Sequence, residues 1–131
     1  MKLDHVGIAV ADLAKATARW AFVAGAPDGP TEEVASQGVR VAFLTAGEVD
    51  IELLEAIRPE SAVGRFVAKR GEGLHHLAFR VPSVDGALAE LVQRGESVVD
   101  KVGRAGARGR RVGFAHPAAF GGTLVEFVEG P

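Results

Sequence analysis

An internal repeat constrains the fold more than any other feature of this sequence. The segments KLDHVGIAV (residues 2–10) and GLHHLAFRV (residues 73–81) both read as strands, and each precedes a segment whose apolar residues have helical spacing. Corresponding residues are 71 positions apart. The matched pairs include Leu3 with Leu74, His5 with His76, and the helix-cap candidates Asp12 with Ser83. A repeat of this kind decides the architecture and has to be identified first.

The repeat continues into the last strand of each half. VDIELLEA (49–56) resembles TLVEFVEG (123–130), so Glu52 matches Glu126 with an offset of 74 that allows for a loop insertion. Further strand-like runs lie between the helix and the last strand of each half: TEEVAS and VRVAFLTA in the first, ESVVDKV and RRVGFAH in the second. Each half is therefore expected to be a βαβββ module.

These modules predict the domain plan. We expect one α+β domain in which two paired βαβββ modules form a curved, partly closed sheet around a metal site. Module one spans about residues 1–58, a linker with a short helix spans about 59–71, and module two spans about 72–131. A chain of 131 residues is long enough for one such domain with a substantial core.

Composition and charge exclude several classes of protein. The formal net charge of −2 gives no global field that would recruit nucleic acid. The absence of cysteine excludes disulfides, thiolate metal sites and a cysteine nucleophile. We find neither a signal peptide nor an apolar run of membrane-spanning length. We therefore expect a soluble cytoplasmic protein without nucleic-acid or membrane partners.

Strand phase separates the adjacent histidines of GEGLHHLAF. Neighbouring side chains of a strand point to opposite faces, so His75 and His76 cannot share one role. The repeat matches His76 with His5, which leaves His75 on the outer face or at a subunit contact. Small residues near both matched histidines leave room on that face.

Two matched His/Glu pairs predict a metal site. Taken singly, a strand histidine is more typical of a structural residue and a strand glutamate of a solvated face. A buried carboxylate needs a partner, however, and the repeat places equivalent pairs where pseudo-twofold symmetry would bring them to one centre. Imidazole with carboxylate suits Co²⁺, Ni²⁺, Zn²⁺, Mn²⁺ or Fe²⁺ better than Ca²⁺. Four protein ligands would leave open positions, which suit a catalytic ion. The proposed ligands are His5, Glu52, His76 and Glu126.

Several stretches resemble a known family. The segments LDHVGIAVADLAKA, SQGVRVAFL, GEGLHHLAF, GARGRRVGFAHP and GGTLVEFVE, which with their surroundings cover nearly the whole chain in order, are similar to the methylmalonyl-CoA epimerases of the vicinal oxygen chelate (glyoxalase/bleomycin-resistance) superfamily. The resemblance implies a homodimer, a divalent metal at the same four positions, and interconversion of (2R)- and (2S)-methylmalonyl-CoA in propionate metabolism. Our candidates for the base that removes the C2 proton are Glu126, which we favour, and Glu52.

Two departures from the family pattern concern the substrate side. Some epimerases carry an acid after QGV at the position of Val41, so the second base is open. The HP motif is followed by Ala118 and Ala119 where relatives often have Lys-Ser. Substrate contacts are expected from His116 and from the cationic run 101–111, including Arg108, which could meet the CoA phosphates or simply be solvated.

Two other functions remain open at this level. A glyoxalase I-type lyase would use similar ligands and enediolate chemistry, so the ligand set cannot distinguish it from an epimerase. A non-catalytic drug-binding protein of the same fold is the second alternative. Such binders generally lack a complete ligand set, whereas this chain has all four candidates.

Overall fold

The computed structural model describes residues 1–130, and their contacts divide them into two compact units. The first unit is His5–His75. The second unit combines Met1–Asp4 with the described residues from His76 onward. The chain therefore passes from one unit to the other directly before each of the two histidines that the repeat matches.

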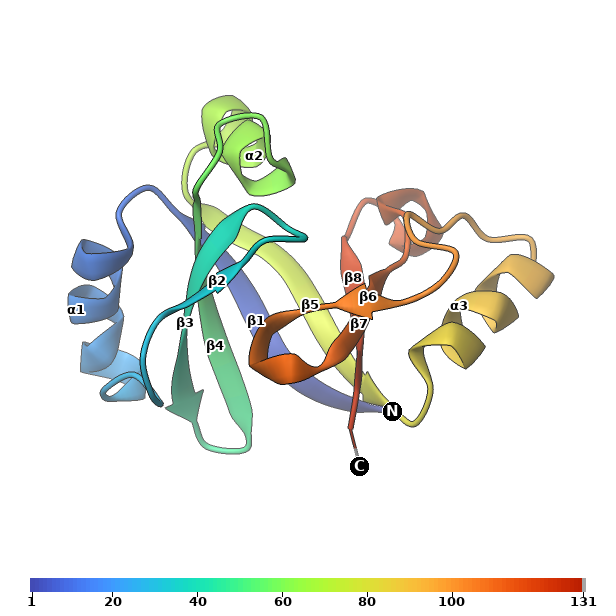
Figure 1. The fold of residues 1–131 in the computed structure, drawn as a ribbon, viewed down its shortest axis with the longest axis horizontal. Helices are drawn as coiled ribbons and strands as arrows, with labels where there is room; N and C mark the ends of the chain where they lie inside the picture. Colours follow the sequence, from blue (N-terminus) through green and yellow to red (C-terminus); the bar gives the residue numbers. More distant parts are fainter. Residues whose placement is uncertain (131) are drawn as a thin grey trace. The chain divides into compact units, whose positions relative to one another are not determined.

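Module one folds around a sheet with the strand order β2-β3-β4-β1. Its strands β1 and β4 are parallel, whereas β2–β3 and β3–β4 are antiparallel. Helix α1 packs against β3 and β4, and the short helix α2 contacts β4 (Figure 1). The elements are β1 (Lys2–Val10), α1 (Leu13–Ala24), β2 (Glu32–Val34), β3 (Val39–Ala46), β4 (Val49–Ala56) and α2 (Ala62–Arg70). Helix α2 lies inside the predicted linker.

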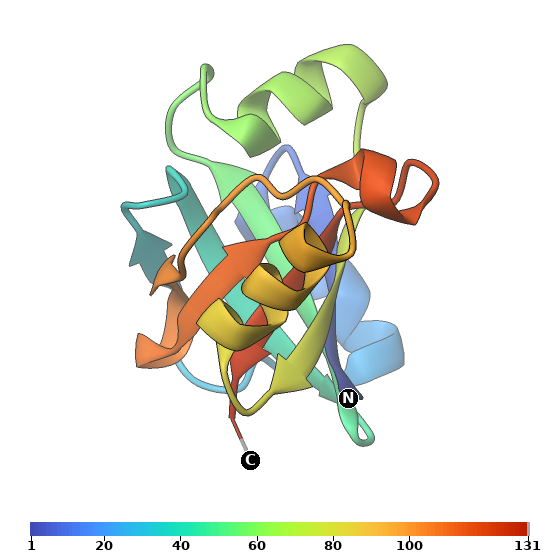
Figure 2. The same cartoon turned by 90° about the vertical axis from the view of Figure 1, so that its right-hand side faces the viewer.

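Module two repeats this order around a sheet arranged β5-β8-β7-β6. Strands β5 and β8 are parallel, and β7 is antiparallel to both β6 and β8. Helix α3 packs on β7 and β8, as Figure 2 shows. The elements are β5 (Gly73–Val81), α3 (Val84–Gln93), β6 (Arg104–Ala105), β7 (Arg111–Phe114) and β8 (Val125–Glu129), with two 3-10 turns at Ala107–Gly109 and Pro117–Phe120.

The same local chemistry starts the main helix of each module. Asp12 caps α1 by accepting the amide of Lys15, and Ser83 caps α3 by accepting the amide of Gly86. In addition, a carboxylate at the end of the last strand accepts the first amide of the helix at 3.0 Å in each module. These bonds join Glu55 to Leu13 and Glu129 to Val84.

Strand register confirms the repeat and the α+β class. Strands β1 and β5, and helices α1 and α3, begin 71 residues apart. Glu52 lies opposite Gly7 in the β1–β4 pair, and Glu126 lies opposite Ala78 in the β5–β8 pair. Gly7 and Ala78 are 71 residues apart, and Glu52 and Glu126 are 74 apart, which are the two offsets of the sequence alignment. The βαβββ plan of both modules is confirmed.

One strand prediction in module two is wrong. The run ESVVDKV forms only an isolated bridge between Val98 and Ala115, and β6 begins later, at Arg104. The amides of Val99 and Asp100 both donate to the carbonyl of Phe114, at 3.0 and 3.2 Å. Two successive amides cannot share one acceptor in a regular ladder, so the backbone bends away at this point.

Within the described residues, no helix is both long and apolar enough to cross a membrane.

Candidate metal centre

Module one holds His5 on β1 against Glu52 on the neighbouring strand β4. The imidazole Nε2 lies 3.3 Å from the carboxylate Oε1. Both side chains are buried, with His5 3% and Glu52 5% exposed. A glutamate this deep in an apolar strand needs a compensating partner, which the imidazole supplies.

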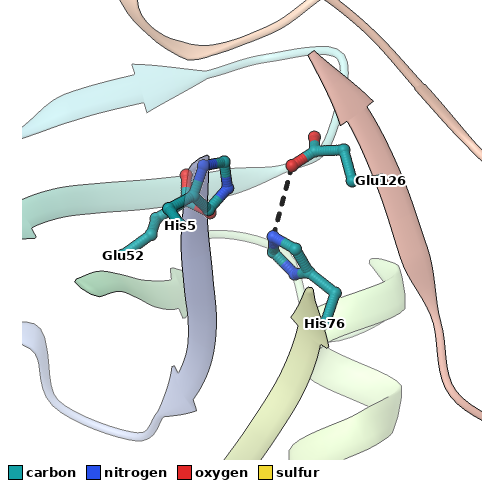
Figure 3. Close-up of side chains that lie close together, drawn as sticks. All are labelled: His5, Glu52, His76 and Glu126. Carbon is teal, nitrogen blue, oxygen red and sulfur yellow. Dashed lines mark ion pairs between the residues drawn. The ribbon is translucent and has the colours of Figure 1, made fainter. Parts of the chain in front are cut away.

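Module two contains the matching pair at the same distance. His76 on β5 places its Nε2 3.3 Å from Oε1 of Glu126 on β8, and both are 3% exposed (Figure 3). The two pairs therefore agree in residue type, in the strands that carry them, in burial and in separation. The pairing of each histidine with its own glutamate follows from the parallel strands that carry them.

An aromatic ring contacts each of these imidazoles edge-on. Phe43 and His5 have ring centroids 5.6 Å apart with an interplanar angle of 90°. Phe114 and His76 have centroids 5.7 Å apart at 84°. Neither phenylalanine was predicted from the sequence as part of this site. Their spacing of 71 residues, the offset that relates the histidines, was the signal that could have found them.

The donor set fits a transition-metal ion. Each of the four side chains offers one ligand atom, an imidazole nitrogen or a carboxylate oxygen, and all four residues are buried. Leaving two such carboxylates buried without cationic compensation would be costly. Nitrogen and oxygen donors together suit Co²⁺, Ni²⁺, Zn²⁺ or Mn²⁺. The buried His/Glu group thus has the chemistry of a metal-binding site.

His75 lies apart from this chemistry. Its ring contacts Phe66 of helix α2 in an edge-to-face geometry, with centroids 5.0 Å apart and an angle of 79°. The side chain is half-buried, in contrast to His76. Adjacent histidines therefore have different surroundings, as the alternation of a strand requires.

The two candidate substrate contacts are both exposed. His116 begins the turn Pro117–Phe120, where its Nδ1 accepts the amide of Ala118 at 3.0 Å. Arg108 has φ 61° and ψ 25°, and it is the only non-glycine residue with positive φ among residues 1–130. A left-handed backbone at a long side chain is uncommon and often marks a functional loop.

Most cations of the run 101–111 are paired with carboxylates. Arg104 lies 3.3 Å from Asp100, and Arg111 donates to both oxygens of Asp85 at 3.0 Å. Arg110 donates to both oxygens of Asp4, also at 3.0 Å. Ion pairs therefore hold most of this loop in place, so it is not a patch of solvated cations. Fewer of its arginines are available to contact a phosphate.

Sequence reasoning also missed Asp4 as a buried charge. It is 5% exposed and accepts from Nε of Arg80 at 3.0 Å as well as from Arg110. The signal was present, because Asp4 is a carboxylate within an apolar strand, as Glu52 is. Two guanidinium groups satisfy it.

The comparisons with known proteins agree with this fold. Residues 4–114 match the family model of the Glyoxalase/Bleomycin resistance protein/Dioxygenase superfamily. The chain therefore belongs to that superfamily. Its relatives place it more narrowly, with the methylmalonyl-CoA epimerases.

Two relatives illustrate this placement over nearly the full chain. The chain is 38% identical to the uncharacterized protein YqjC of Bacillus subtilis (strain 168) over 128 residues, which cover 98% of this chain and 91% of the relative. It is 35% identical to an ethylmalonyl-CoA/methylmalonyl-CoA epimerase of Cereibacter sphaeroides over 130 residues, with coverage of 98% and 97%.

Solved structures match equally well. Methylmalonyl-CoA epimerase from Mycobacterium tuberculosis superposes with a TM-score of 0.91 at 35% identity, covering 99% of this chain and 88% of the other. A methylmalonyl-CoA epimerase in complex with methylmalonyl-CoA and NH₄⁺ gives a TM-score of 0.90 at 38% identity, with coverage of 98% and 94%. The fold is that of the vicinal oxygen chelate proteins.

Proposed function

We propose that the protein is a metal-dependent isomerase that interconverts (2R)- and (2S)-methylmalonyl-CoA. The observation that carries the proposal is the pair of equivalent buried His–Glu contacts, each at 3.3 Å. We further propose that both pairs bind one divalent ion, with Co²⁺, Ni²⁺, Zn²⁺ and Mn²⁺ as candidates. Support comes from the donor chemistry, from the repeat and from the names of the relatives.

The C2 hydrogen of methylmalonyl-CoA lies between a thioester carbonyl and a carboxylate, and is therefore acidic for a C–H group. A divalent ion, when bound, supplies positive charge near the thioester oxygen on which enolate charge gathers. The task left to the protein is to remove the proton from one face of C2 and return a proton to the other.

Glu126 is our candidate for one proton-transfer group, with Glu52 as the second. The C2–H bond breaks as a carboxylate oxygen takes the proton, and the bond electrons remain in the enolate. A proton delivered to the opposite face restores C2 with inverted configuration, so nothing is consumed. Val41 is 1% exposed and has no titratable group, so it cannot serve as a base.

Replacing Glu126 by Gln tests this role. Gln keeps an oxygen donor of similar size but cannot accept a proton, so the variant is expected to bind metal and to lose proton exchange at C2. The matched variant Glu52→Gln reports on the second face. Isotope exchange at C2 and metal content, measured on the same preparation, separate the two functions. Exchange at the parent rate in Glu126→Gln would refute the assignment.

Recognition of the CoA part is proposed for residues near the cationic loop. Arg108 is exposed and offers a planar guanidinium suited to phosphate, and His116 offers an exposed imidazole at the start of a turn. We also propose, from the resemblance, a homodimer in the cytoplasm.

The two alternative functions are less well supported. Two relatives are named as methylmalonyl-CoA epimerases, one of them for ethylmalonyl-CoA as well, and neither name refers to a glutathione adduct. A drug-binding protein would not need two buried His–Glu pairs. The Cereibacter sphaeroides relative is named for ethylmalonyl-CoA as well as methylmalonyl-CoA, so a slightly larger acyl group is worth including in the assay.

The direct test uses one epimer of methylmalonyl-CoA in D₂O with metal-loaded protein. We expect deuterium at C2 together with conversion to the mixture of both epimers. Parallel incubations with ethylmalonyl-CoA and with the hemithioacetal of methylglyoxal and glutathione test the substrate class. No exchange with any of the candidate metals, or turnover of the hemithioacetal alone, would overturn the proposal.

A further inference from the structure

Two phenylalanines occupy equivalent places beside the two histidines. Phe43 lies on β3 and Phe114 on β7, and in the antiparallel register each stands directly opposite a proposed glutamate ligand, Glu52 or Glu126. Residues directly opposite in an antiparallel pair project from the same face of the sheet. Each ring therefore shares a face with a His–Glu pair of its own module.

The contact geometry limits how each imidazole can turn. The rings meet at 90° for Phe43 with His5 and at 84° for Phe114 with His76. An edge-to-face contact is a preferred aromatic arrangement, and both phenylalanines are buried in a packed environment. Rotation of the imidazole about its Cβ–Cγ bond would break this contact and move Nε2 away from the carboxylate.

The second ring is itself held in place by other groups. The Arg104 guanidinium lies 5.6 Å from the centroid of Phe114 and pairs with Asp100. The other oxygen of Asp100 accepts the amide of Phe114 at 2.9 Å. A single acidic residue thus fixes both the backbone of Phe114 and the cation over its ring.

We infer that Phe43 and Phe114 are positioning residues, which hold the imidazoles of His5 and His76 with Nε2 directed toward the metal. The inference rests on the proposed metal site and deepens it. Groups that orient a metal-bound histidine usually do so by a hydrogen bond, and losing them weakens metal binding tenfold or more. Here the orienting group is an aromatic ring, supplied once by each module.

The experiment compares Phe43→Leu and Phe114→Leu with the control Phe127→Leu. Phe127 is buried in the core of module two and follows Glu126, so its side chain points to the opposite face of β8. Co²⁺ binding to metal-free protein is measured by calorimetry, and the visible absorption of the Co²⁺ form reports ligand geometry. Thermal unfolding of the metal-free proteins checks folding.

We expect about tenfold weaker Co²⁺ binding and a changed Co²⁺ spectrum for each positioning variant. The control should bind within twofold of the parent and keep its spectrum, even though it is destabilised. If a leucine variant fails to fold, the same measurement is made with methionine, which fills the space more adaptably but has no ring. If the parent binds Co²⁺ and both positioning variants keep its affinity and spectrum, the role of the two phenylalanines is refuted while the proposed metal site stands. A parent that binds no Co²⁺ would overturn the proposed metal site as well.

Discussion

The residue that precedes the proposed ligand histidine differs between the two modules, although the two histidines occupy equivalent positions. In module one it is Asp4, a buried carboxylate that accepts from Arg80 and Arg110. In module two it is His75, a half-buried ring that packs on Phe66. The strand face that bears the His–Glu pair is thus the same in both modules. The opposite face carries different residues, which make structural contacts. Equivalent sequence positions need not have equivalent functions.

The largest expected effect separates the two adjacent histidines. His76→Ala removes a proposed ligand and leaves Glu126 buried without its imidazole, so we expect loss of both metal binding and activity. His75→Ala removes one edge-to-face contact at a half-buried site, so we expect near-parent metal content with a modest loss of stability. Metal analysis and thermal unfolding of both variants make the comparison. Equal metal content in the two would show that the strand phase was assigned wrongly.

The next largest effect concerns Asp4, the structural counterpart of His75. Asp4→Asn removes the buried charge that two half-buried guanidinium groups share, which we expect to lower the free energy of unfolding by about 3 kcal/mol. Urea unfolding of metal-free protein measures this change. Metal affinity of the folded variant should remain near that of the parent, because the carboxylate lies on the face away from the His–Glu pair. A variant as stable as the parent would contradict the assigned ion network.

The smallest effect concerns the hydrogen bond and ion pair of Asp85, which are present in module two and have no counterpart in module one. Asp85 accepts the amide of Gly103 at 2.7 Å and pairs with Arg111, whereas the matching residue in module one is Ala14. The Gly103 amide, followed by the Arg111 guanidinium, lowers the pKa of Asp85 below its usual 3.8. The Asp85 side chain is about half exposed, so solvent screens these interactions and the stabilisation is small.

The sign of its pH dependence follows from the lowered pKa. Stabilisation by Asp85 is fully present above the unfolded-state pKa and is lost as the pH falls through the lower pKa of the folded state. The melting temperature of the parent should therefore exceed that of Asp85→Asn at neutral pH, and the difference should vanish in acid. Ala14→Ser is the control at the matching position, with no such trend expected. A difference that grows as the pH falls would contradict the account.

Sequence reasoning recovered those features that depend on local periodicity and on the repeat. The offset of 71 predicted the equivalent strands, the helix caps and the choice of His76 over His75, because each depends on a few neighbouring residues. The structure pairs each of these histidines with the expected glutamate. A role for all four as ligands of one ion stays a prediction.

Features that depend on contacts distant in sequence were not predicted. The run ESVVDKV has strand composition, yet two of its amides share the carbonyl of Phe114 and the Asp100 carboxylate accepts the Phe114 amide, and composition carries no information about these contacts. Arg110 pairs with Asp4, which is 106 residues away in the sequence. The sequence alone therefore gave no sign that a carboxylate holds this arginine of the cationic loop. Secondary-structure propensity depends on the residues of one segment, whereas these ion pairs depend on which segments the fold brings together.

The most direct test of the central claim is the number of ions bound per chain. If both His–Glu pairs serve one metal centre, metal-free parent should bind one Co²⁺ per chain with high affinity, and His5→Ala or His76→Ala alone should abolish that binding. Calorimetric titration, checked by elemental analysis, gives this number. Two ions per chain in the parent, or one tightly bound ion remaining in both single variants, would mean that each module binds metal independently and would contradict the account.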